Sequence, residues 1–142
     1  MMRLVLDTNV VASSLLWGGN PLRLLQAGRA HRIEHYTRTP LLAELTEILS
    51  RRKFEQKLAA SQLTVEQLVD RYAALAAVVR PIALPRVAPD PDDDVVIATA
   101  LAAKADLLVT GDRPLLAVGE YQGVRIVDVG EALRRVAAQA SP

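Results

Sequence analysis

The segment Ala88–Asp112 most constrains the fold, because an acidic run, an apolar helix and a buried strand follow one another in it. Four of the five residues Asp90–Asp94 are aspartates. The apolar segment Val95–Ala103 then predicts a helix, and Leu107–Thr110 predicts a buried strand. Carboxylates this close together repel one another and raise each other's pKa values unless positive charge compensates them. Since the run contains no Lys or Arg, a helix N-terminus or a divalent cation has to supply that charge.

Composition narrows the class of protein. With 142 residues, half of them apolar, the chain predicts one domain over residues 1–142. A net charge of +1 argues neither for nor against a nucleic-acid partner, and the lack of cysteine excludes disulfides and thiolate sites. No apolar run approaches the roughly 20 residues that span a membrane. Charge near the N-terminus argues against a signal peptide, so we expect a cytoplasmic protein without a membrane partner.

Apolar runs rich in β-forming residues alternate with helical patterns along the chain. The predicted strands are Arg3–Leu6, His35–Thr37, Leu107–Thr110 and Val124–Val127. The predicted helices are Val10–Leu16, Leu22–Gly28, Thr64–Val79, Val95–Ala103 and Gly130–Ala138, with one more that Thr39 caps and Pro40 begins. The prolines predict a connector over Arg80–Pro91 and a turn at Pro114. This alternation predicts an α/β fold of three layers, with a central, mostly parallel sheet flanked by helices.

Carboxylates from distant segments are predicted to meet at one edge of this sheet. Asp7 ends the first strand, Asp112 follows a later one, and Asp93 with its neighbours begins the helix between them. Glu44 lies in the first two turns of its helix. In a parallel sheet, ligands bind outside the carboxyl ends of the strands. A cluster without His or Cys offers only oxygen ligands, which suits Mg²⁺ or Mn²⁺ and the hydrolysis of a phosphodiester.

Four short motifs follow one another along the chain: Asp7-Thr8-Asn9, Leu41-Leu42-Ala43-Glu44-Leu45, Asp90-Pro91-Asp92-Asp93, and Leu107-Leu108-Val109-Thr110-Gly111-Asp112. Together they resemble the motifs of PIN-domain ribonucleases, most closely bacterial PIN proteins of the VapC-like toxin type. The resemblance covers Leu4 to about Val129. It implies a PIN-like fold and a Mg²⁺- or Mn²⁺-dependent RNA endonuclease. It also implies a homodimer that acts as the toxin of a type II toxin–antitoxin system and is blocked by a cognate antitoxin.

Carried over residue by residue, the resemblance implies four catalytic metal ligands: Asp7, Glu44, Asp93 and Asp112. The third of these is open. Alignment of the alanine-rich helix favours Asp93, which we take, whereas counting back from Ile97 favours Asp94. Asp90 is a further candidate, acting through a water molecule.

The resemblance also implies supporting roles. Asn9 matches a residue that steadies the first aspartate, and Thr110 is expected to hold a water or a phosphate oxygen. From the residues themselves, Arg51, Arg52 and Lys53 are candidate phosphate contacts, with a solvated helix end as the alternative. The continuation Arg113-Pro114 departs from the more common pattern of the family.

Ordinary explanations exist for each carboxylate alone. Asp7 could be a helix N-cap, Asp112 a turn residue, Glu44 a surface residue and the acidic run a solvated loop. The alternative function is a catalytically silent PIN-fold module that binds RNA or protein. A phosphotransfer domain is disfavoured. A haloacid-dehalogenase-like phosphatase needs a second aspartate two residues after its nucleophilic aspartate, and Asn9 stands at that position here.

Overall fold

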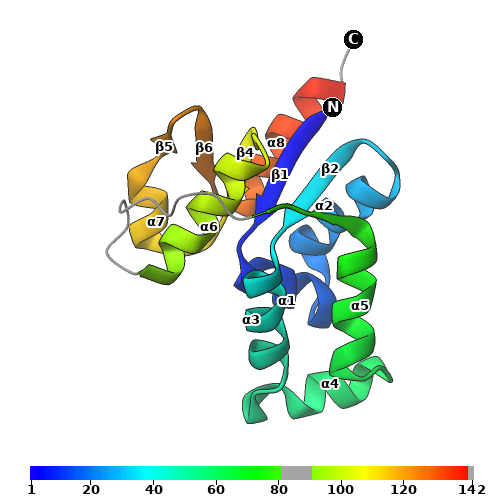
Figure 1. The fold of residues 1–142 in the computed structure, drawn as a ribbon. Coiled ribbons are helices and arrows are strands. Elements are labelled where there is room, and N and C mark those ends of the chain that lie inside the picture. The colour runs from blue at the N-terminus through cyan, green and yellow to red at the C-terminus, as the bar shows by residue number, and fades with distance from the viewer. Residues whose placement is uncertain (81–90, 141–142) are drawn as a thin grey trace.

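The computed structural model describes residues 1–80 and 91–140, with Pro91, Asp92 and Ala140 described by their backbone alone. Its strands are β1 (Met2–Leu6), β2 (Ile33–Thr37), β3 (Ala76–Val78), β4 (Leu107–Val109), β5 (Glu120–Tyr121) and β6 (Val124–Val127). Its helices are α1 (Thr8–Leu16), α2 (Gly19–Arg29), α3 (Thr39–Leu49), α4 (Glu55–Ser61), α5 (Val65–Leu75), α6 (Pro91–Ala102), α7 (Arg113–Val118) and α8 (Val129–Ala140), with the 3₁₀ turn η1 (Arg52–Phe54) before α4. Figure 1 shows how they are arranged.

The strands form one six-stranded sheet in the order β3-β2-β1-β4-β6-β5. All neighbouring strands are parallel except β5, which pairs antiparallel with β6. The carboxyl ends of β2, β1, β4 and β6 therefore lie along one edge of the sheet. This confirms the predicted, mostly parallel sheet.

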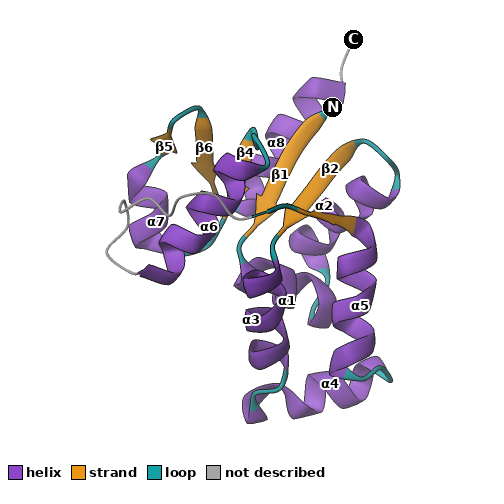
Figure 2. Cartoon of the chain, viewed as in Figure 1, coloured by secondary structure: helices purple, strands orange, loops and turns teal. Residues whose placement is uncertain are grey.

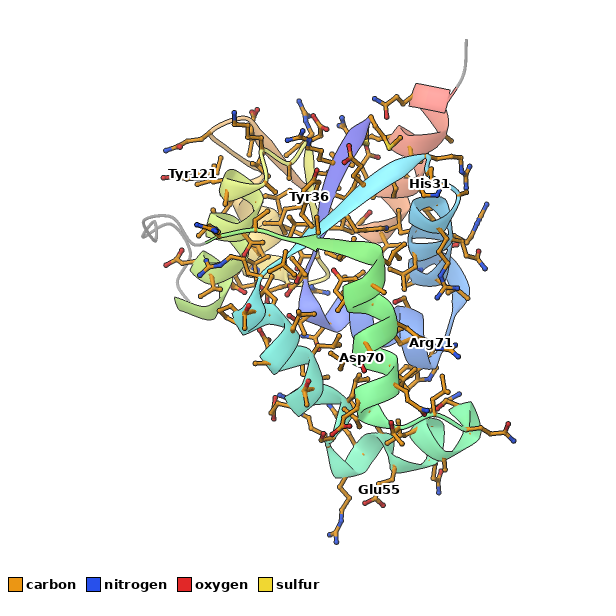
Figure 3. All side chains as sticks on the ribbon, turned by 45° about the vertical axis from the view of Figure 1, so that its right-hand side comes forward. His31, Tyr36, Glu55, Asp70, Arg71 and Tyr121 are labelled. Atoms are coloured by element: carbon orange, nitrogen blue, oxygen red, sulfur yellow. The ribbon has the colours of Figure 1, made fainter. Side chains whose placement is uncertain are left out.

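Helices cover both faces of the sheet (Figure 2), and Figure 3 shows the side chains that the helices and strands carry. Side chains alternate between the faces of a strand, so Leu4 and Leu6 of β1 lie in one apolar core and Val5 lies in the other. The core around Leu4 and Leu6 includes residues of α1, α2, α3, α5 and α8, whereas the core around Val5 includes residues of α6 and α7. The predicted three-layer α/β/α fold is confirmed.

The predicted helix Thr64–Val79 is shorter than expected. Its capping box is present: Gln67 donates its backbone N–H to the Thr64 hydroxyl at 3.1 Å, and the Gln67 side chain accepts from the Thr64 N–H at 2.9 Å. However, α5 ends at Leu75, and Ala76–Val78 becomes strand β3 beside β2. Pairing with a neighbouring strand overrides the helical preference of the alanines there.

The acidic run begins its helix, as predicted for Asp93 and its neighbours, although the apolar segment alone had set the start at Val95. Helix α6 begins at Pro91, so Asp92–Asp94 form its first turn instead of a loop before Val95. Proline suits the first turn of a helix, and carboxylates there are stabilised by the helix dipole. Residues 81–90, which include Asp90 and most of the predicted connector, lie outside the described part of the chain.

Two further predictions at helix starts are wrong in detail. The N-cap of α3 is Arg38, and Thr39 is already helical. The turn at Pro114 is the first turn of α7, which Asp112 caps by accepting the Leu115 N–H at 3.2 Å. A capping aspartate followed by proline near the first position starts a helix, so the proline did not mark a simple turn.

None of the helices in the described ranges has the length and apolar character needed to cross a lipid bilayer.

Candidate active site

Asp7 is the centre of the polar groups at the carboxyl edge of the sheet. It directly follows β1, the strand with β2 on one side and β4 on the other, and its side chain is 7% exposed. One carboxylate oxygen, Oδ1, accepts the Thr8 N–H at 2.8 Å, which makes Asp7 the N-cap of α1. The capping role considered for Asp7 is therefore real. It accounts for only one of its two oxygens.

Thr110 holds the other oxygen. Its fully buried hydroxyl donates to Asp7 Oδ2 at 2.7 Å and accepts the Asp112 N–H at 3.0 Å. The parallel register of β1 and β4 pairs Leu6 with Val109, so Asp7 and Thr110 are the next pair along the ladder. One hydroxyl thus connects the two aspartates that the sequence predicted to meet.

The two carboxylates influence each other electrostatically. Burial raises the pKa of Asp7, the hydrogen bonds from Thr110 and Thr8 lower it, and the nearby charge of Asp112 raises it again. The net shift is upward. Asp112 itself is half-buried and uses one oxygen to cap α7. A buried carboxylate facing a second one disfavours its own ionised form, an arrangement that a bound cation relieves.

Glu44 is contributed by helix α3, which follows strand β2. It is half-buried in the second turn of α3 and lines a hollow of about 240 Å³ together with Pro40, Glu47, Arg51 and Val95. Val95 belongs to α6 and directly follows Asp94. The structure therefore places Glu44 at the junction of α3 with the start of α6.

The two candidates for the third position differ in burial. Asp94 is 3% exposed, whereas Asp93 is half-buried, and both have interaction partners. Among the described side chains, no group of three carboxylates or histidines lies close enough to hold a metal ion. The described residues thus bring Asp7 and Asp112 together, with Glu44 and Asp94 on two helices that meet nearby. The choice between Asp93 and Asp94 stays a prediction.

Of the two residues expected to support the site, Thr110 contacts Asp7 and Asn9 lies at the surface. Asn9 is exposed, and the hydrogen bonds to Asp7 come from Thr110 and Thr8. Asn9 instead lines a hollow of about 380 Å³ with Ser13, Thr110 and Asp128, and also Val10, Pro21, Gly111, Val129 and Gly130. Sequence reasoning missed Ser13 and Asp128, because a lone serine in a helix and a capping aspartate carry no distinctive signal. This hollow borders Thr110.

The basic residues Arg51, Arg52 and Lys53 follow the end of α3 that is far from Asp7, although Arg51 lines the same hollow as Glu44. Helix α3 starts at the sheet edge and has 11 residues, a length of about 16 Å, and Arg51 follows its end. Arg51 forms an ion pair with Glu47 at 2.9 Å, while Arg52 and Lys53 are exposed. Figure 1 shows the end of α3 well away from β1. Their predicted role as phosphate contacts would concern phosphates distant from Asp7.

A three-layer α/β/α domain with acidic side chains at the carboxyl edge of its parallel strands is a fold class suited to binding a metal ion and a phosphate ester. The family model of the PIN domain matches residues 3–114 of this chain, which therefore belongs to the PIN-domain family. PIN domains are commonly nucleases and typically bind divalent metal ions, so membership supports a nuclease-type enzyme. No curated protein matches the chain significantly.

Proposed function

We propose that the protein is a Mg²⁺- or Mn²⁺-dependent endoribonuclease, a hydrolase of RNA phosphodiester bonds. The observation that carries this proposal is the buried Asp7, held by Thr110 beside Asp112 at the carboxyl edge of the sheet. The residues fit a hard divalent cation, because every side chain in the set offers oxygen and the charge of Asp112 adds to burial in raising the pKa of Asp7. Asp7, Glu44, Asp112 and one of Asp93 and Asp94 would hold the metal. A bound Mg²⁺ or Mn²⁺ supplies Lewis-acid chemistry, activating water and neutralising charge on the phosphate.

The protein side chains have defined tasks in this reaction. Thr110 orients Asp7, and burial raises the pKa of the Asp7 carboxylate, which strengthens it as a proton acceptor. As water attacks phosphorus, its proton passes to this carboxylate, while the bond from phosphorus to the leaving ribose oxygen breaks. No covalent enzyme intermediate is involved, since no Cys is present and none of the carboxylates has to attack phosphorus.

The biological role follows from the resemblance of the four motifs to VapC-like proteins. We propose a cytoplasmic toxin of a type II toxin–antitoxin system, active as a homodimer and bound by a cognate antitoxin. Light scattering of the purified chain tests the dimer. We expect twice the mass of the monomer, and the mass of the monomer would contradict the proposal.

The test of the nuclease is cleavage of a mixed set of single-stranded and structured RNAs with Mg²⁺, with Mn²⁺ and with EDTA. We expect cutting with either metal and none with EDTA. Comparison of Asp93→Asn with Asp94→Asn identifies the third ligand, because loss of that ligand abolishes cutting while loss of its neighbour leaves most of it. Absence of cutting with both metals on every RNA would contradict the nuclease and favour a silent PIN-fold binding module.

A further inference from the structure

Arg38 is a buried cation without a hydrogen-bonding partner for most of its head group. It is 9% exposed, and its Nε and Nη1 atoms are enclosed and unpartnered within the described ranges. The ion pairs seen in residues 1–80 and 91–140 join other side chains. Burying a charged group without a counter-ion or full hydrogen bonding lowers the stability of a fold, so stability does not explain why Arg38 is buried.

The sheet register places Arg38 next to Asp7. Val5 of β1 pairs with Tyr36 of β2, and both Asp7 and Arg38 stand two residues further along parallel strands. Arg38 keeps the extended conformation of the strand, with φ −137° and ψ 158°, so the register continues to it. Arg38, Asp7 and Thr110 therefore form one row across three adjacent strand ends.

Strand alternation also sets the face on which Arg38 lies. Val5 belongs to the core that contains α6 residues and Tyr36 packs against it, so side chains two positions further, Asp7 and Arg38, lie on the same face. The bond from Thr110 to Asp7 bears this out for two of the three residues in the row. Arg38 does not pair with Asp7 directly, since it is not among the causes of the shifted Asp7 pKa.

We propose that Arg38 binds a phosphate of the RNA backbone adjacent to the one that is cleaved. A guanidinium presents a planar fork of N–H donors that matches phosphate oxygens, and a phosphate would supply the partner that the folded protein lacks. The register places Arg38 beside Asp7 without an ion pair between the two, which fits a second phosphate next to the one at the carboxylates. Because Nε and Nη1 are enclosed in the free protein, binding requires the head group to turn toward the carboxyl edge of the sheet. This inference rests on the proposed ribonuclease function.

The experiment measures RNA binding without cleavage. Fluorescence anisotropy of a labelled, mixed-sequence single-stranded RNA is recorded with the Asp7→Asn protein and Mg²⁺, over a series of salt concentrations. Adding Arg38→Gln should weaken binding roughly tenfold or more, because a hydrogen-bonded charge is lost. The slope of log affinity against log salt should become shallower by about 0.7, as for one phosphate contact on a single strand. Arg38→Lys should keep the slope and lose part of the affinity.

Arg32 provides the matched control. It lies just before β2, at the opposite end of the same strand, and is exposed. Arg32→Gln removes the same charge and should leave affinity and slope close to those of the parent protein. If Arg32→Gln and Arg38→Gln weakened binding equally, the effect would come from the loss of any positive charge and not from a specific contact of Arg38, and the proposal would be overturned.

Thermal unfolding separates this role from a structural one. Arg38→Met removes a buried charge without a partner, so its unfolding temperature should equal or exceed that of the wild type. A fall of several degrees would assign Arg38 to the fold and overturn the proposal. So would unchanged RNA binding by Arg38→Gln, which would point to a carboxylate of a protein partner instead. Because binding is measured apart from cleavage, failure of the nuclease and failure of the Arg38 contact are distinguishable.

Discussion

The two ends of the β1–β4 strand pair carry aspartates in contrasting settings. At the amino end, Asp106 precedes β4, is exposed, and accepts the Arg3 N–H of β1 at 2.8 Å. At the carboxyl end, Asp7 is buried beside Asp112 and its pKa is raised. The first aspartate completes the strand pairing in water, whereas the second is held in a position that disfavours its own charge. The difference supports the proposed function, in which the amino end of the sheet contributes stability and the carboxyl end contributes the chemistry.

Substituting each aspartate in turn should give the largest contrast. Asp7→Asn should reduce RNA cleavage at least roughly 100-fold, because a metal ligand and the proposed proton acceptor are lost. Asp106→Asn should leave cleavage near the wild-type rate, since the amide oxygen still accepts the Arg3 N–H. Initial rates of RNA cleavage measure both variants. Similar losses would remove the distinction between the two ends.

The Thr110 hydroxyl provides a second, smaller contrast. Thr110→Val removes one hydrogen bond to Asp7 and one from the Asp112 N–H, so the free energy of unfolding should fall by about 1–3 kcal/mol. Cleavage should also fall, because Asp7 loses its orientation. Denaturant unfolding and cleavage rates measure the two effects.

Thr99 is the matched control for Thr110. It is also fully buried, but its hydroxyl donates to the Val95 carbonyl within its own helix at 2.8 Å. Thr99→Val should cost less stability and leave cleavage intact. If the Thr99 variant lost cleavage as strongly as the Thr110 variant, the loss would reflect buried hydroxyls in general.

The smallest expected effect concerns pH and stability in EDTA. Since burial raises the folded pKa of Asp7 above the ordinary value of 3.8, the folded protein binds this proton more tightly than the unfolded chain. The contribution of Asp7 to stability is therefore most favourable below pH 3.8 and is lost as the pH rises through the folded pKa. Asp7→Asn should remove this loss and be the more stable protein at neutral pH, as measured by thermal unfolding across pH. A less stable variant at neutral pH would contradict it.

Adding Mg²⁺ supplies the check on that prediction. A cation that binds only the folded state should raise the unfolding temperature of the wild type and have little effect on Asp7→Asn. An equal shift in both proteins would place the cation elsewhere.

The sequence predicted which residues lie at the strand ends better than it predicted the contacts that their side chains make. Asp7 and Asp112 could be placed because each follows a short apolar run, and such runs become parallel strands with a common edge. The contact through Thr110 could not be foreseen, since it depends on the exact register of β1 with β4. Arg38 was missed for a similar reason: beside a threonine that resembles a cap, an arginine looks like a surface residue.

The elements that were missed depend on tertiary pairing. Strand β3 consists mostly of alanines, which favour a helix, and it is a strand because it pairs with β2. Strand β5 has two residues and exists through its pairing with β6. Neither carries enough local signal to be recognised from the sequence.

The position of β1 in the sheet has a consequence for protein synthesis. One neighbour of β1 is β2, which follows soon after, but the other is β4, and the Thr110–Asp7 contact spans 103 residues. Such long-range pairings form late, because a long loop has to be closed first. A ribosome making this chain would have to release β4 and Asp112 before the first aspartate acquires its partners. We expect the growing chain to be harmless to the messenger that encodes it until most of the domain has emerged.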